Sequence, residues 1–237
     1  MALRMQNRPL ELLFLLWAVP CPGQKRVMTV DDLWSMQRIQ DLALSPDGRW
    51  IAFTVSQPQR DGDPGLDICL VSSLGGPTRR LTTHPAADRT PRWSPDGNLL
   101  SFISGRTGSA QIHTIPMDGG EARQVSRLKS GVEDFLWSPD GRYFALITPV
   151  SAGPAPGDST VRADAPEGAR LIDGLFYRHW NQWRSSDRRH IFVMSFAGGQ
   201  AWDITPGDFD SPTLTLGSGR DFAFSPDGNE IAFVRNT

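Results

Sequence analysis

The chain has 237 residues, with 24 basic and 26 acidic side chains and a formal net charge of -2. This near-neutral balance excludes the basic footprint that nucleic-acid binding requires. Hydrophobic residues make up 39% and charged residues 21%, so the bulk of the chain is neither disordered nor membrane-spanning. The 23 glycines, 19 prolines and 8 tryptophans favour many short strands joined by turns.

Residues 1–23 have the layout of a secretory signal peptide. Two arginines precede an apolar run over 10–19, and small or turn-forming residues follow it. The run is too short for a helix that spans a bilayer, which needs about 20 residues. We expect cleavage after Gly23, export to the periplasm or the cell exterior, and no membrane span. Two alternatives stay open: a lipid-modified Cys21, and an ordinary N-terminal segment, because Glu11 interrupts the apolar run.

A short helix is expected in the next segment, 24–41. Thr29 can cap it, and Asp31 and Asp32 would lie in its first turn, where negative charge complements the positive end of a helix.

The tetrapeptide Ser-Pro-Asp-Gly occurs four times, starting at Ser45, Ser94, Ser138 and Ser225. Apolar residues alternate before and after each copy, which predicts one strand entering the turn and one leaving it. Proline presets φ at the second turn position, aspartate tolerates the third, and glycine accepts the left-handed conformation at the fourth. Each copy therefore predicts a β-hairpin.

A second hairpin is predicted in each unit by a pair of glycines, at 75–76, 119–120 and 198–199. Two hairpins in a period of about 44 residues make a four-stranded unit, the size of a β-propeller blade. A column of small residues also repeats and fits close packing between blades: Ala52, Ser101, Ala145 and Ala232.

We therefore predict an all-β fold, an incomplete β-propeller of about three and a half blades with a short N-terminal helix. Within the propeller segment 42–237, the blades are expected at about 42–90, 91–134, 135–221 and 222–237, the last being incomplete. Propellers close with about four to eight blades. We thus expect an N-terminal fragment of a longer protein, whose open sheet edges allow a homo-oligomer to form.

The third unit contains an insertion at about 150–189. Its first half is rich in proline, glycine and alanine and is expected to be an exposed loop. Its second half concentrates aromatic and basic residues, which either fill a blade interface as a strand pair or form a recognition edge facing a cavity. The candidate substrate-contact residues are Tyr177, Arg178, His179, Trp180 and Trp183.

From Val27 onward the sequence resembles the N-terminal propeller of the prolyl oligopeptidase family of serine peptidases, particularly bacterial dipeptidyl-peptidase and acylaminoacyl-peptidase-like members. Three stretches carry the resemblance: 28–34, 175–180 with Trp183, and 203–208 leading to the fourth Ser-Pro-Asp-Gly. TolB-like propellers share the repeat. The resemblance implies a C-terminal α/β-hydrolase domain, which is absent from these residues.

No catalytic residue is carried over from this family. Its nucleophile lies in a Gly-x-Ser-x-Gly elbow, followed by Asp and His, and the chain contains no such motif. The adjacent glutamates with which dipeptidyl-peptidase members hold the substrate's amino terminus are also missing, because every glutamate here is isolated. We expect no cofactor and no metal site, since the sequence lacks zinc-type Cys/His spacing.

The leading hypothesis is the propeller fragment of an exported serine peptidase, which gates the access of peptides to a C-terminal α/β-hydrolase domain that is absent from these residues. A non-enzymatic TolB-like propeller that binds proteins in the bacterial envelope is the alternative. A propeller lyase or metal enzyme is a third class, but it would need clustered His or carboxylate ligands. Sequence beyond codon 237 separates the first two, because only the peptidase requires the nucleophile elbow.

Overall fold

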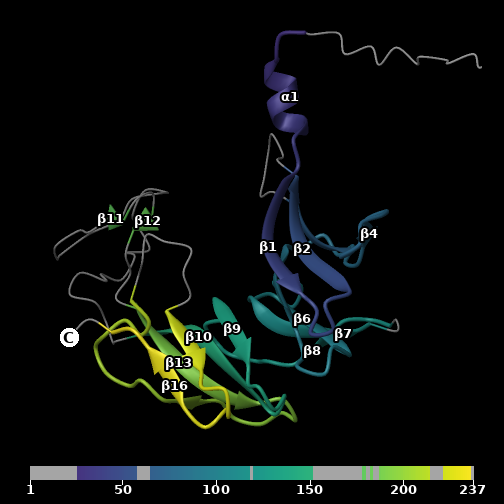
Figure 1. The fold of residues 1–237 in the computed structure, drawn as a ribbon. Coiled ribbons are helices and arrows are strands. Elements are labelled where there is room, and N and C mark those ends of the chain that lie inside the picture. Colours follow the sequence, from purple (N-terminus) through teal and green to yellow (C-terminus); the bar gives the residue numbers. More distant parts are fainter. Residues whose placement is uncertain are drawn as a thin grey trace, which may run out of the picture.

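The computed structural model describes residues 26–57, 65–117, 120–151, 178–179, 182–183, 187–213 and 221–235. Within these ranges the chain is all-β with one short helix (Figure 1). Three sheets have four antiparallel strands and two have two strands. This confirms the predicted fold class and its propeller-like blades. The predicted signal peptide, 1–23, and its alternative at Cys21 lie outside the described residues.

The sheets follow one another in chain order, so we number them as blades. Blade 1 contains β1 (Arg38–Leu44), β2 (Trp50–Gln57), β3 (Gly65–Ser72) and β4 (Arg79–Arg80). Blade 2 contains β5 (Asp88–Trp93), β6 (Leu99–Ser104), β7 (Gln111–Pro116) and β8 (Arg123–Gln124). Blade 3 contains β9 (Asp134–Trp137), β10 (Tyr143–Ser151), β13 (Asp187–Ser195) and β14 (Trp202–Asp203). Blade 4 contains β15 (Phe222–Phe224) and β16 (Ile231–Phe233), and a separate hairpin pairs β11 (Arg178–His179) with β12 (Gln182–Trp183).

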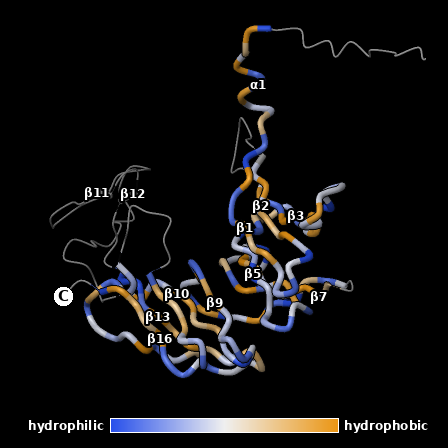
Figure 2. The backbone as a smooth tube through the Cα atoms, viewed as in Figure 1, coloured by the Kyte–Doolittle hydropathy of each residue, from blue (hydrophilic) through white to orange (hydrophobic). Residues whose placement is uncertain are grey.

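The helix α1 (Val30–Ser35) forms where the sequence predicts it. The Thr29 hydroxyl accepts a hydrogen bond from the Asp32 amide, and the Asp32 carboxylate accepts one from the Thr29 amide, which completes a capping box. The helix buries none of its residues and stands apart from the blades (Figures 1 and 2). Among the described residues, no helix has the length and apolar character needed to cross a bilayer.

Each Ser-Pro-Asp-Gly copy forms the predicted turn through a repeated set of hydrogen bonds. In the third copy the Ser138 hydroxyl donates to Asp140 Oδ1 at 2.6 Å and accepts from the Tyr143 amide at 2.9 Å. The Gly141 amide donates to the Ser138 carbonyl at 2.9 Å, and its φ of 72° lies in the left-handed region that glycine favours. The other three copies repeat the Ser–Asp contact at 2.5 to 2.6 Å.

The outer strands are only two residues long, and a hydroxyl side chain extends their pairing. The Thr82 hydroxyl accepts a hydrogen bond from the Ile68 amide at 3.0 Å, where the short ladder of β4 has ended. Blades 2 and 3 repeat this contact, from the Ile112 amide to Ser126 at 2.8 Å and from the Ile191 amide to Thr205 at 2.9 Å. The outer edge of each full blade is therefore secured by the same side-chain to backbone contact.

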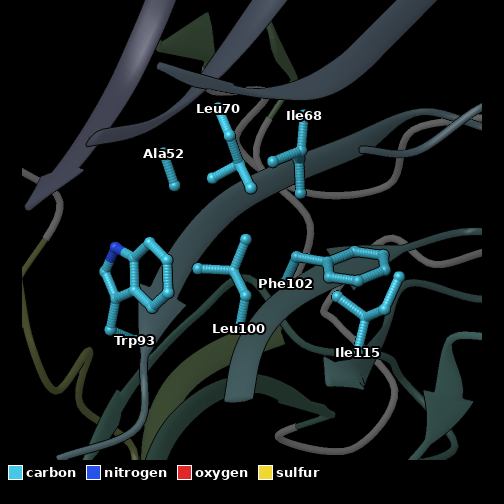
Figure 3. Close-up of a cluster of buried hydrophobic side chains, with 7 residues drawn as sticks. All are labelled: Ala52, Ile68, Leu70, Trp93, Leu100, Phe102 and Ile115. Atoms are coloured by element: carbon cyan, nitrogen blue, oxygen red, sulfur yellow. The ribbon is translucent and has the colours of Figure 1, made fainter. Parts of the chain in front are cut away.

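The hydrophobic core consists of separate clusters between neighbouring blades. Between blades 1 and 2, Ala52, Ile68 and Leu70 face Trp93, Leu100, Phe102 and Ile115 (Figure 3). Similar clusters lie between blades 2 and 3 and between blades 3 and 4. The small column lies at these interfaces, because Ala52, Ser101 and Ala145 are fully buried. Hydrophobic residues accordingly follow the strands, while the turns are more hydrophilic (Figure 2).

Candidate functional site

None of the five predicted substrate-contact residues has a described side chain, and two of the five lie outside the described part of the chain. Tyr177 and Trp180 lie outside it. Arg178, His179 and Trp183 belong to the β11–β12 hairpin, in which Arg178 pairs with Trp183, but their side chains are not among those described. Their role in substrate contact therefore stays a prediction.

The backbone places the insertion at one end of blade 3. Strands β10 and β13 pair as far as Ser151 and Asp187, whereas β9 pairs with β10 only from Asp134 onward. Residues 150–151 and 187–189, expected within the insertion, thus belong to the blade. The insertion leaves the blade beyond the start of its inner strand, away from the Ser-Pro-Asp-Gly turn (Figure 1).

Charged side chains gather at this same end, around the starts of β5 and β9. We call this group the inner-strand rim and define it by Arg89, Glu133, Asp134 and Arg189. Arg89 Nη1 donates to the Glu133 carbonyl at 2.9 Å, which joins blade 2 to blade 3. Arg189 Nε donates to Glu133 Oε2 at 2.6 Å. Arg92, from the same strand as Arg89, reaches Asp134 Oδ1 at 3.4 Å.

The inner strands of blades 1 and 2 are bulged at equivalent positions. The β1–β2 register shifts between Gln40 and Ala43, and the β5–β6 register shifts in the same way. Asp41 and Thr90 have positive φ, at 47° and 59°, a conformation that is uncommon for residues other than glycine. Bulges are frequent at barrel rims and beside binding sites, because they redirect a side chain.

The bulged position carries a sequence signal that the motif analysis missed. It lies four residues before each Ser of the repeat, and three of its four occupants are aspartates: Asp41, Thr90, Asp134 and Asp221. A comparison of the four copies at the position four residues before the repeat serine would have revealed these aspartates. It adds Asp41 and Asp221 as candidate charged groups on the inner strands.

The opposite end of the inner strands is mostly apolar, and Arg92 is the one charged residue in its lining. A hollow of about 380 Å³ lies among β1, β5 and β9 and their turns. Such a lining suits apolar side chains better than charged ones. The hollow is lined by Leu42, Ala43, Leu44, Pro46, Arg92, Trp93, Ser94, Pro95, Leu136, Trp137, Ser138 and Pro139.

The buried histidines are engaged in packing and hydrogen bonds. His113 stacks on Phe102 with 6.0 Å between ring centroids, and burial lowers the pKa of its imidazole. His190 Nδ1 lies 2.7 Å from Asp203 Oδ2 and its Nε2 lies 2.9 Å from the Gly207 carbonyl. Both ring nitrogens of His190 therefore contact acceptors, and the contact with Asp203 connects β13 to β14.

Blade 2 also buries an ion pair. The Arg106 guanidinium donates from Nη2 to both oxygens of Asp88, at 3.0 and 2.9 Å, and lies 5.3 Å from the centre of the Phe102 ring. The Asp88 carboxylate is fully buried, so this pair must be kept intact to avoid a buried unpaired charge. In the ranges that the structure describes, no group of three His, Cys, Asp or Glu residues could hold a metal ion.

The sequence of this chain matches one protein family and is similar to known peptidases. Residues 39–154 match the family described as TolB beta propeller domain. Dipeptidyl-peptidase 5 of Porphyromonas endodontalis is 31% identical over 217 residues, which cover 90% of this chain and 31% of that protein. The uncharacterized peptidase YuxL of Bacillus subtilis is 29% identical over 215 residues, covering 90% of this chain and 32% of that protein.

A solved acylaminoacyl peptidase of Pyrococcus horikoshii shares the fold, with a TM-score of 0.53 and 15% identity over 76% of this chain and 27% of that chain. The present chain spans about a third of the length of the curated relatives it matches. The resemblance drawn from the repeats and flanking motifs is thereby confirmed. Residues 39–154 thus match the TolB beta propeller domain, and the chain is homologous to a part of dipeptidyl-peptidase 5 and of YuxL.

Proposed function

We propose that this chain is the propeller part of an exported dipeptidyl-peptidase-like enzyme, and that it controls the access of peptides to a catalytic α/β-hydrolase domain in the full-length protein. The alignment with dipeptidyl-peptidase 5 carries this proposal, because it covers 90% of this chain but only 31% of the relative. The missing Gly-x-Ser-x-Gly elbow agrees with it, since the chemistry would lie on the remaining two thirds.

The two ends of the inner strands support different parts of this role. The inner-strand rim presents paired charges beside the base of the insertion, where a peptide backbone and its polar groups could be admitted. The apolar hollow at the Ser-Pro-Asp-Gly end could hold apolar side chains. If peptides pass along the inner strands from the rim to the hollow, the rigid blades around this path would exclude folded proteins and admit extended peptides.

The first test is to read the gene beyond codon 237. The proposal expects further Ser-Pro-Asp-Gly repeats, then a Gly-x-Ser-x-Gly motif, followed by Asp and His. A stop codon after additional blades, without the elbow, would instead support the TolB-like binding protein, which the match of residues 39–154 favours as the second candidate.

A protein-level test separates the same two candidates. The 237-residue chain and the full-length product are each incubated with a chromogenic dipeptide amide. The proposal expects release of the chromophore only by the full-length product. Hydrolysis by the 237-residue chain, or by neither protein, would contradict it.

A further inference from the structure

The interface between blades 1 and 2 buries polar side chains at positions that are apolar between blades 2 and 3. The first is Thr54, nine residues after the repeat serine, where blades 2 and 3 have Ile103 and Ile147. Thr54 is 0% exposed and pairs across β2 and β3 with Ile68, a member of the cluster between blades 1 and 2. Paired residues of an antiparallel ladder share one face of the sheet, so Thr54 faces blade 2.

His113 is the polar residue on the blade 2 side of the same interface. It pairs with Phe102 across β6 and β7, stacks on its ring and is 1% exposed. Phe102 belongs to the same cluster as Ile68. The equivalent residue of blade 3 is Phe192, because each of the two directly follows the isoleucine whose amide binds the outer-strand hydroxyl.

The equivalent pair between blades 2 and 3 consists of Ile103 and Phe192, which lie in one apolar cluster. Because the blades repeat one arrangement, Thr54 and His113 occupy the corresponding pair of positions between blades 1 and 2. We call Thr54 and His113 the polar pair. A hydroxyl and an imidazole therefore stand where the next interface has two hydrocarbon side chains, although packing alone does not require this exchange.

The polar pair contains two buried polar atoms, Thr54 Oγ1 and His113 Nε2, that find no hydrogen-bond partner among the described residues. His113 Nδ1 lies 3.1 Å from the Gln111 carbonyl. Since a carbonyl accepts but does not donate, Nδ1 carries the proton of the neutral ring and Nε2 presents a lone pair. A second proton, on Nε2, would place a positive charge inside an apolar cluster.

The charged groups of blade 2 give such a proton little compensation. Both oxygens of Asp88 already bind Arg106, whose guanidinium lies 5.3 Å from the centre of the Phe102 ring. Burial is the main cause that lowers the pKa of His113 below its ordinary 6.5. The charges of Arg106 and His84 act in the same direction, whereas the Gln111 carbonyl and Asp88 act against it. On β5, Arg89 and Arg92 are directed to blade 3.

The charged groups of blade 1 are directed away from the polar pair. Asp67 and Cys69 alternate with Ile68 along β3 and therefore lie on the other face of the sheet. Asp67 there binds Arg80 at 2.7 Å. The charged residues of β1, Arg38 and Asp41, are exposed to solvent. A proton on His113 would thus meet an uncharged face of blade 1.

We propose that the polar pair makes the interface between blades 1 and 2 an acid-sensitive seam. A proton taken up from solvent by His113 Nε2 loosens blade 1 from blade 2, while the apolar interface between blades 2 and 3 stays closed. The inference is independent of the proposed peptidase role. Described blades flank this interface on both sides, so the seam is internal to the chain.

The direction of the pH effect follows from burial. The opened seam binds the proton more tightly than the closed one, because the imidazole then regains contact with water. Opening is therefore favoured as pH falls below about 6.5, by at most about tenfold per pH unit for one proton. This range lies above the acid range in which aspartates titrate.

Two tryptophans report on the two interfaces separately. Trp93 Nε1 donates to the Ala43 carbonyl of blade 1 at 3.0 Å, and Trp137 Nε1 donates to Ser101 Oγ of blade 2 at 3.1 Å. The full-length product is labelled with fluorotryptophan, and the two fluorine NMR resonances are assigned with Trp93→Phe and Trp137→Phe. The readout is the difference in each resonance between H2O and D2O, which grows when water reaches the ring. Spectra are recorded at intervals between neutral pH and the acid range of the aspartates.

The matched variant is Thr54→Ile combined with His113→Phe, which installs the residue types found between blades 2 and 3. In the parent, the solvent effect at Trp93 is expected to grow below about pH 6.5 while that at Trp137 stays constant. In the double variant both are expected to stay constant. His113→Gln, which remains uncharged, is expected to behave as the double variant does, and replaces it should the double variant lose the Trp137 resonance of the parent.

Three results would overturn the proposal. The first is a parent in which Trp93 stays shielded from water over the whole range. The second is an equal response of Trp93 in the parent and in the uncharged variants, since another group would then be titrating. The third is a response of Trp137 that accompanies that of Trp93, because the whole propeller rather than one seam would then be opening.

Discussion

At the level of single residues, the contacts of the repeat serine explain why the sequence Ser-Pro-Asp-Gly recurs in every blade. Its hydroxyl binds the aspartate two residues later and receives the amide that opens the next strand, so it connects the turn to both strands of the hairpin. Ser138 performs this role while fully buried, whereas Ser225 in blade 4 is partly exposed. The cost of losing the hydroxyl should therefore depend on the blade.

We predict that Ser138→Ala lowers the free energy of unfolding by about 1–3 kcal/mol, because the Tyr143 amide loses its partner, the buried Ser138 hydroxyl. Ser225→Ala is the matched control and should cost less, since water can replace the hydroxyl there. Urea denaturation monitored by tryptophan fluorescence measures both values. Equal losses for the two variants would show that burial does not set the cost.

The turn aspartates should make stability sensitive to acid. The hydrogen bond from the Ser138 hydroxyl, followed by that from the Arg142 amide, lowers the pKa of Asp140 from 3.8 to about 2, and the pKa of Asp227 falls to about 2 for the same kinds of reason. A carboxyl group whose folded pKa is lowered stabilises the fold above its unfolded pKa, and loses that contribution as pH falls through the folded value.

We therefore predict that the urea midpoint falls between about pH 4 and pH 2, and that Asp140→Asn makes this fall shallower. The midpoint is measured at intervals from pH 6 to pH 2. An identical slope for the parent and the variant would contradict the assigned role of Asp140 in acid sensitivity.

At the level of elements, the blades are held together by apolar clusters and by a few long side chains that cross between sheets. Arg89 is the clearest of these links, because its side chain extends from blade 2 and donates to two carbonyls beside β9. These are the carbonyls of Glu133, at 2.9 Å, and Val132, at 3.4 Å. Arg49 is its counterpart on the surface, with a side chain that is 81% exposed and 3.7 Å from Asp47.

We predict that Arg89→Ala lowers the free energy of unfolding by about 1.5–3 kcal/mol, the usual contribution of hydrogen bonds from a charged group. Arg49→Ala should change it by less than about 1 kcal/mol, because exposed ion pairs contribute little. Urea denaturation of both variants gives the comparison. A larger effect at Arg49 than at Arg89 would contradict the proposed link between blades 2 and 3.

The hairpins were predictable from the sequence because their causes are local. The Ser-Pro-Asp-Gly turns, the glycine pairs and the Thr29 cap each depend on residues within a few positions of one another. The bulges at Asp41 and Thr90 were not predicted, because a positive φ in these residues depends on the whole sheet. The Arg89 contact to Glu133 joins residues 44 positions apart, which no single motif reveals.

The candidate site was predictable only in part, for the same reason. The aromatic and basic stretch 176–183 was recognised by composition, but composition does not place its side chains relative to the blades. The inner-strand rim was missed because Arg89, Glu133 and Arg189 come from different blade segments and meet only after the sheets have packed.

At the level of the whole molecule, the described blades repeat one arrangement, in which an apolar cluster lies between each pair of neighbouring sheets. The homology to peptidases bears on what the full-length protein does, and the proposed export bears on where in the cell it does so. If residues 1–23 act as a signal peptide, the mature chain begins at Gln24.

Intact-mass analysis tests this directly when the chain is expressed in a bacterium and recovered from the periplasm. The expected mass is that of a chain starting at Gln24. Recovery of the uncleaved chain from the cytoplasm alone would contradict export, and a lipid adduct on Cys21 would favour the alternative of lipid modification.

The central claim is that this propeller serves a serine peptidase whose catalytic residues lie elsewhere in the full-length protein. The most direct measurement is to label the full-length product with a fluorophosphonate probe that reacts with activated serines, and to locate the modified peptide by mass spectrometry. The account predicts one labelled serine, in a Gly-x-Ser-x-Gly sequence outside residues 1–237. A full-length product that takes up no label, or that is labelled within residues 1–237, would contradict it.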